Sequence, residues 1–204
     1  MITLTVDDKE FKIVNSYEEL SLGQYIDIIN IGESKVKQDA IEADMSVICA
    51  LSDNAEELKE LLWSFDTDEF DELRSAFDWV RDDIDILESF KQLPPKESIE
   101  IEGKKYGIIS NHNKLSLGEV VSYETLISQE QSDFHRLEIA FGILLRPIGD
   151  DGKLVKFTED IFLEVVKNKY KINMMEIYST IGFFLSGAKI STKGTTKRFS
   201  IQTK

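Results

Sequence analysis

Residues with distinctive chemistry are scarce in this 204-residue sequence, which has one cysteine, two histidines and three prolines. The lone cysteine, Cys49, cannot form an internal disulfide, so we expect a reducing compartment. It lies in an apolar run, which predicts a buried and unreactive thiol. Neither His112 nor His135 has a second histidine or a cysteine at the spacing of a metal site, so we expect both to be structural or surface residues.

The motifs of common enzyme classes are also missing. No glycine-rich phosphate loop precedes a Lys-Ser or Lys-Thr pair, and there is no nucleophile elbow. The acidic run Asp66–Asp71 fails as a calcium loop, because Asp71 stands where that loop needs glycine and Phe77 where it needs glutamate. We therefore expect no enzyme, no catalytic residue, no metal and no cofactor, and we assign the acidic run to a helix start.

Positive charge is in the minority, with 24 lysines and arginines against 38 acidic residues and a net charge of −14. Such a surface repels nucleic acid and anionic membranes, so we expect neither as a partner. The uncharged stretch 177–188 is too short for a transmembrane helix of about 20 residues, and no signal-peptide pattern is visible. We expect a soluble intracellular protein that binds partners with basic patches.

Two segments of the chain resemble each other at a constant offset of 95 residues. When Ile2–Ile28 is placed over Glu97–Tyr123, six of the 27 positions are identical. In each segment, two stretches that alternate between apolar and polar residues flank a short acidic break, which predicts a β-hairpin. The identical Leu-Ser-Leu-Gly then predicts a helix start in which Ser21 and Ser116 form capping boxes with Gln24 and Glu119.

These patterns predict an α+β fold, mainly α, made of two similar modules, each with a hairpin, a capped helix and further packed helices. Adjacent prolines prevent a helix from continuing, so the boundary is expected at the linker 93–96. The modules are then residues 1–92 and 97–187, and a basic tail, 188–204, follows. Asn54, Asp66 and Thr158 are expected to begin further helices.

Two segments that differ between the halves are candidate partner-binding sites. The first is an amphipathic helix whose apolar stripe suits either core packing or a partner. The second is the basic tail, which can dock on an acidic surface of this chain or a neighbour. The candidate residues are Phe70, Leu73, Phe77, Val80, Ile84 and Leu87 in the stripe and Lys193, Lys197 and Arg198 in the tail.

The arrangement resembles two groups of phage proteins. The hairpin followed by Leu20–Ile28 and an acidic helical stretch is similar to the small tail assembly chaperones of tailed bacteriophages. The second half is similar to uncharacterised two-module proteins of crAss-like phages, at Lys105–Ile109, Leu115–Glu119, Leu144–Ile148 and Ile181–Phe184. The resemblance covers Met1 to about Gly187, and its motifs are structural. It implies a phage setting and no catalytic site.

The sequence therefore predicts a non-enzymatic phage assembly protein that holds another structural protein, such as the tape measure or a tail or neck protein. Under this hypothesis it acts in the host cytoplasm during assembly and can remain in the virion. One alternative is a structural component of the neck, tail or capsid. A remoter alternative is an acidic inhibitor of a host enzyme, and a homo-oligomer is also left open.

Overall fold

The computed structural model describes residues 1–6, 8–34, 40–80, 96–109, 115–129 and 133–177. Within these ranges the chain is α+β and mainly helical, as predicted. The first half contains β1 (Ile2–Val6), β2 (Lys9–Ile13), α1 (Leu22–Ser34), α2 (Ala40–Ala50), α3 (Ala55–Leu62) and α4 (Thr67–Ser75), with 3-10 turns at Tyr17–Glu19 and Asp78–Val80.

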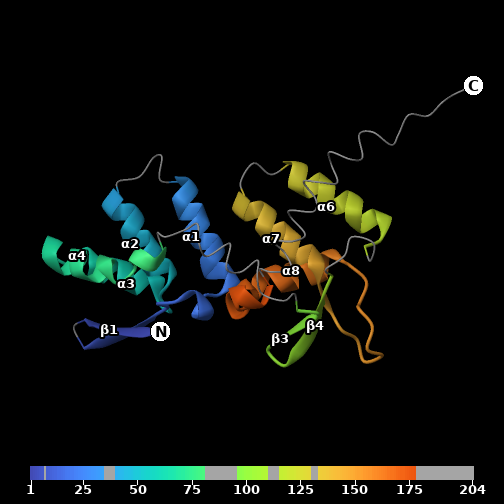
Figure 1. Ribbon diagram of the computed structural model, residues 1–204, viewed down its shortest axis with the longest axis horizontal. Helices are drawn as coiled ribbons and strands as arrows, with labels where there is room; N and C mark the ends of the chain where they lie inside the picture. The colour runs from blue at the N-terminus through green and yellow to red at the C-terminus, as the bar shows by residue number, and fades with distance from the viewer. Residues whose placement is uncertain (7, 35–39, 81–95, 110–114, 130–132, 178–204) are drawn as a thin grey trace, which may run out of the picture.

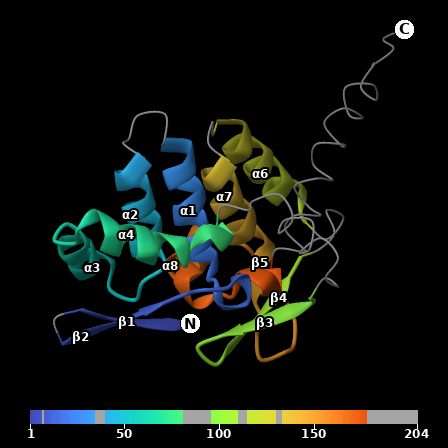
Figure 2. The same ribbon diagram turned by 60° about the vertical axis from the view of Figure 1, so that its left-hand side comes forward.

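The second half has β3 (Ser98–Ile101), β4 (Lys104–Ile108), α6 (Leu117–Gln129), α7 (Asp133–Leu144), β5 (Leu145–Pro147), α8 (Glu159–Lys167) and a 3-10 turn at Lys169–Lys171. Figures 1 and 2 show both hairpins along one edge of the molecule, with α1, α2, α6 and α7 standing on the other side. One hydrophobic core cluster includes residues of both halves, and α1 packs against α7.

The two hairpins share their register at the offset of 95. Val6 pairs with Lys9 in the first and Ile101 with Lys104 in the second. Asp8 and Gly103, also 95 apart, both lie in the left-handed region, with φ of 63° and 77°. Glycine takes this conformation freely and aspartate at a small cost, so both turns close tightly.

The chain returns to each hairpin in the same way after its second helix. The amide of Val14 donates to the carbonyl of Leu51 at 3.0 Å, and the amide of Ile109 donates to that of Leu144 at 2.9 Å. In the second half this contact extends into β5, which pairs antiparallel with β4. The halves thus follow a common plan, and gene duplication as its origin stays a prediction.

Both capping boxes are present. Ser21 Oγ accepts from the amide of Gln24 at 3.2 Å, and Gln24 Oε1 accepts from the amide of Ser21 at 3.1 Å. Glu119 and Ser116 make the same pair of bonds, at 3.3 and 2.6 Å. The helices that these boxes open, α1 and α6, both have 13 residues. Asn54, Asp66 and Thr158 also stand at the predicted helix starts.

The predicted long helix from Phe70 to Leu87 is wrong. The helix α4 ends at Ser75, where the amide of Phe77 turns to the carbonyl of Arg74 and tightens the last turn. The ring of Trp79 then packs edge-on against the ring of Tyr17, with the ring centroids 4.5 Å apart. The backbone carbonyl of Trp79 accepts from the Tyr17 hydroxyl at 2.7 Å. This packing directs the chain away from the helix axis.

The end of the second half packs on the first half. The Tyr170 ring lies so close to Gly23 that a Cβ there would be 2.4 Å from Cδ1 of the ring. The Tyr170 hydroxyl donates to Asp27 at 2.9 Å. The predicted boundary at 93–96 stays a prediction, with residues 93–95 outside the described ranges, but residues assigned to the second module contact the first.

We expect Gly23→Ala to destabilise the protein by about 1–3 kcal/mol, because the added methyl must displace the Tyr170 ring. The control is Gly32→Ala near the end of the same helix, where a Cβ would have no described atom within 4 Å. There, alanine should stabilise the helix by up to about 1 kcal/mol. Urea unfolding of both variants measures the difference, and equal effects would contradict the close packing of Tyr170.

Candidate protein-binding face

The start of α1 binds a segment of the same chain in which the 3-10 turn Lys169–Lys171 is followed by the extended residues Ile172 and Asn173. The amide of Leu22 donates to the carbonyl of Ile172 at 2.8 Å, and the amide of Met174 donates to that of Leu20 at 2.8 Å. These bonds flank an antiparallel bridge between Ser21 and Asn173. The segment Lys169–Met174 therefore gives backbone partners to a helix start that lacks intrahelical ones.

Two apolar side chains at the start of α1 are buried in the core. Leu22 is 1% exposed and Ile26, one helical turn later, is 2% exposed. Gly23, between them on the same face, allows the Tyr170 ring to approach the helix backbone. Leucine and glycine in the first turn, with isoleucine three residues after the glycine, therefore form an apolar seat at the start of α1.

The same seat on α6 is uncovered. Leu117, Gly118 and Val121 occupy the positions of Leu22, Gly23 and Ile26, and we call these three residues the α6 face. Leu117 is 81% exposed and Val121 is 53% exposed. Complete burial of their exposed parts would contribute roughly 2–4 kcal/mol. Scattered apolar side chains are ordinary on a surface, but here their counterparts show what such a seat binds.

Backbone groups on the α6 face are available as well. Among the described residues, the amide of Leu117 donates no hydrogen bond, whereas its counterpart Leu22 donates to Ile172. An N–H at the first turn of a helix needs an acceptor from water or from another segment. The α6 face thus offers both the apolar contact and the backbone donor that hold Lys169–Met174 on α1.

A buried ion pair fixes the start of α6 in place. Arg146 on β5 is 1% exposed, and its Nη2 donates to Glu119 Oε1 at 3.0 Å while Nη1 donates to the Leu145 carbonyl at 3.2 Å. Its guanidinium lies over the Phe157 ring, 4.5 Å from the ring centre. Since Glu119 also caps α6, this pair ties the helix start to the sheet.

The environment shifts the pKa values of both partners. Burial lowers the pKa of Arg146, and the Glu119 carboxylate opposes this shift. Burial acts to raise the pKa of Glu119, but the hydrogen bonds from Ser116 and the pairing with Arg146 outweigh it and hold the pKa below its usual value. Both groups are therefore charged near neutral pH.

In the first half, an uncharged side chain caps the helix and ties its start to the neighbouring backbone. Gln24, the counterpart of Glu119, donates from Nε2 to the Leu51 carbonyl at 3.2 Å. An amide carries both an acceptor for the capping box and a donor for the sheet, whereas a carboxylate carries only acceptors. Glutamate in the second half therefore requires a separate donor, and Arg146 supplies it.

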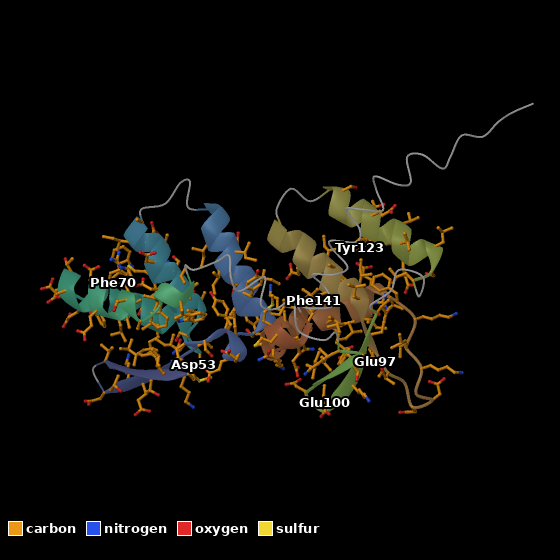
Figure 3. All side chains as sticks on the ribbon, viewed as in Figure 1. Asp53, Phe70, Glu97, Glu100, Tyr123 and Phe141 are labelled. Atoms are coloured by element: carbon orange, nitrogen blue, oxygen red, sulfur yellow. The ribbon has the colours of Figure 1, made fainter. Side chains whose placement is uncertain are left out.

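The predicted partner-binding residues lie elsewhere. Phe70, Phe77 and Val80 are buried in the core, and Leu73 packs against it, which matches the core-packing alternative. Figure 3 shows Phe70 on α4, remote from Tyr123 on α6. Outside the described residues lie Ile84, Leu87, Lys193, Lys197 and Arg198.

The structure also bears on the other residues that the sequence singles out. Cys49 is buried, and burial raises its pKa to about 11, so the thiol is unreactive near neutral pH. Backbone placement puts His135 in α7, and His112 lies outside the described ranges. In the part of the chain that the structure describes, no group of three acidic, histidine or cysteine residues is suited to a metal ion. No described helix is long and apolar enough to span a membrane.

Comparisons with protein-family models, curated proteins and solved structures find nothing that matches this chain.

Sequence reasoning missed the α6 face. The identical Ser-Leu-Gly at 21–23 and 116–118 was visible, but capping explains only the serine. Capping does not require the leucine or the glycine that follow it. Their recurrence was the available signal that both helix starts form a seat for another segment.

Replacing Arg146 by methionine should destabilise the protein by about 3 kcal/mol, because the Glu119 carboxylate loses its buried partner. Adding Glu119→Gln should recover more than half of that loss, since glutamine satisfies the corresponding site in the first half. Urea unfolding of both single variants and the double variant forms the thermodynamic cycle. A double variant no more stable than Arg146→Met would show that the pair is not coupled.

Stability should also fall in acid through Glu119. Its pKa is lower when folded, so its stabilising contribution is fully present above the unfolded pKa of about 4.3 and is lost as pH falls through the folded pKa. Below about pH 4, unfolding free energy should decline less steeply for Glu119→Gln than for the unmodified chain. Denaturant titrations at a series of pH values measure this, and parallel curves would contradict it.

Proposed function

We propose that this chain is a non-enzymatic bacteriophage assembly protein that binds another phage structural protein, such as the tape measure or a tail or neck protein, through the α6 face. One observation carries the proposal: the seat that holds Lys169–Met174 on α1 recurs on α6 without a cover. A protein that presents an apolar seat with an available backbone donor is suited to capturing a short segment of a partner.

The contacts on α1 define the chemistry of the partner segment. It makes a tight turn that places an aromatic ring over Gly118, and then extends so that a backbone carbonyl accepts from the amide of Leu117. An apolar residue near Val121 would complete the contact. Glu124 of α6, a helix that has no basic residue, favours a segment with basic flanks, which agrees with the net charge of −14.

The phage setting is supported by the resemblance of Leu20–Ile28 and of the second half to phage assembly proteins. In this proposal the protein works in the host cytoplasm while tails are being built. It shields a segment of a structural protein that would otherwise associate too early.

The double substitution Leu117→Asp with Val121→Asp tests the proposal in co-expression with the tape measure protein of the same genome. The unmodified chain should raise the soluble yield of the tape measure and co-purify with it. The double variant should lose both effects, because two charges on the seat prevent burial of an apolar segment. Aspartate in the first turns of α6 suits the helix dipole, so the fold should be retained.

Leu163→Asp on α8 is the matched control, since Leu163 is also an exposed leucine on a helix of the second half. It should behave like the unmodified chain. If the tape measure is equally soluble with and without this protein, the chaperone function is refuted. Mass spectrometry of purified particles then separates the roles, because a stoichiometric chain in the virion would indicate a structural component.

A further inference from the structure

The C-terminal residues repeat the pattern of the segment that binds α1. Tyr170-Lys171-Ile172-Asn173-Met174 and Phe199-Ser200-Ile201-Gln202-Thr203 both begin with an aromatic residue. Both have isoleucine two positions later and a carboxamide side chain directly after it. A basic residue, Lys169 or Arg198, precedes each aromatic residue.

Each shared residue of Tyr170–Asn173 makes a specific contact with α1 or with the turn that precedes it. The aromatic ring of Tyr170 covers Gly23, and the carbonyl of Ile172 accepts from the helix amide. The carboxamide of Asn173 donates to the carbonyl of Glu18 at 2.6 Å. The shared residues are therefore those that make the contacts.

We propose that residues Phe199–Thr203 of the same chain dock on the α6 face and compete there with the partner. Phe199 covers Gly118, the carbonyl of Ile201 accepts from the amide of Leu117, and the amide of Thr203 donates to the carbonyl of Leu115. The docking itself is independent of the partner, whereas the competition rests on the proposed function.

One difference between the two helices agrees with this pairing. On α1 the Tyr170 hydroxyl donates to the carboxylate of Asp27. At the corresponding position α6 has Ser122, which carries no charge, and the proposed ring, Phe199, has no hydroxyl. The carboxylate acceptor on the helix and the hydroxyl donor on the ring are thus both absent in the second pair. This is expected if Phe199 binds α6 as Tyr170 binds α1.

Charge and reach also favour the tail of the same chain. Residues 188–204 contain five lysines and arginines and no acid, whereas α6 contains Glu124, the Glu119 carboxylate that pairs with Arg146, and no basic residue. The chain from Ile177 to Phe199 can extend over roughly 70 Å. A folded chain of this length has a radius of gyration of only about 17 Å. Tethering raises the local concentration of the tail, which favours it over a second copy.

Limited digestion of the full-length chain with trypsin tests the docking, because trypsin cuts after Lys197 and Arg198. When cleavage follows opening of the docked segment, its rate reports the open population. Cleavage after Arg198 should become at least about fivefold faster in Phe199→Ala and in Leu117→Asp with Val121→Asp. Leu163→Asp should leave the rate unchanged.

Equal cleavage rates in all four proteins would overturn the proposal. Docking within one chain also requires protection to be independent of protein concentration over about a hundredfold range. Protection that grows with concentration, together with a dimer in light scattering, would assign the segment to a second copy and refute docking within the chain.

The outcome is separable from the partner experiment. Unchanged cleavage with lost tape-measure binding in the double variant would reject the tail docking and retain the proposed function. If both proposals hold, Phe199→Ala should increase capture of the tape measure, because the competing segment is removed. Faster cleavage without any tape-measure binding would retain the docking alone.

Discussion

The first amide groups of an α-helix have no acceptor within the helix, and the arrangement of this protein depends on how that need is met at α1. Ser21 and Gln24 satisfy part of it locally, and the carbonyl of Ile172, from the far end of the described chain, accepts from Leu22. The same segment buries Ile172 and Met174 and places the Tyr170 ring against Gly23. One short segment thus provides hydrogen bonds, apolar burial and the joint between the halves.

The two halves use one plan with different chemistry at the helix start. Gln24 reaches the neighbouring backbone by its own amide, whereas Glu119 depends on Arg146, a fully buried cation. Burial of an ion pair gives little net stability, but it makes each partner costly to lose. The start of α6 is therefore held firmly even though its outer face is uncovered, and a rigid seat loses little entropy when it binds.

Local features of the fold were predictable from the sequence, and long-range ones were not. Alternation and capping residues located both hairpins and the starts of α1 and α6, because these depend on neighbours within about four residues. The apolar spacing after Phe70 predicted one long helix, but the contact between Trp79 and Tyr17 ends it. Identical Leu-Gly pairs could not show that Gly23 is covered and Gly118 is open, since that depends on where Tyr170 packs.

The contact between Tyr170 and Asp27 joins residues 143 positions apart, and this separation has a consequence for synthesis. On the ribosome, the hairpin and helices of the first half emerge long before the segment that covers α1. Until residue 174 leaves the exit tunnel, the amide of Leu22 and the face of α1 at Gly23 lack the partners that they have in the folded chain. Domains that must wait for a distant segment expose apolar surface during translation, and crowded polysomes favour mispairing of such surfaces. A segment of the second half thus completes the start of α1.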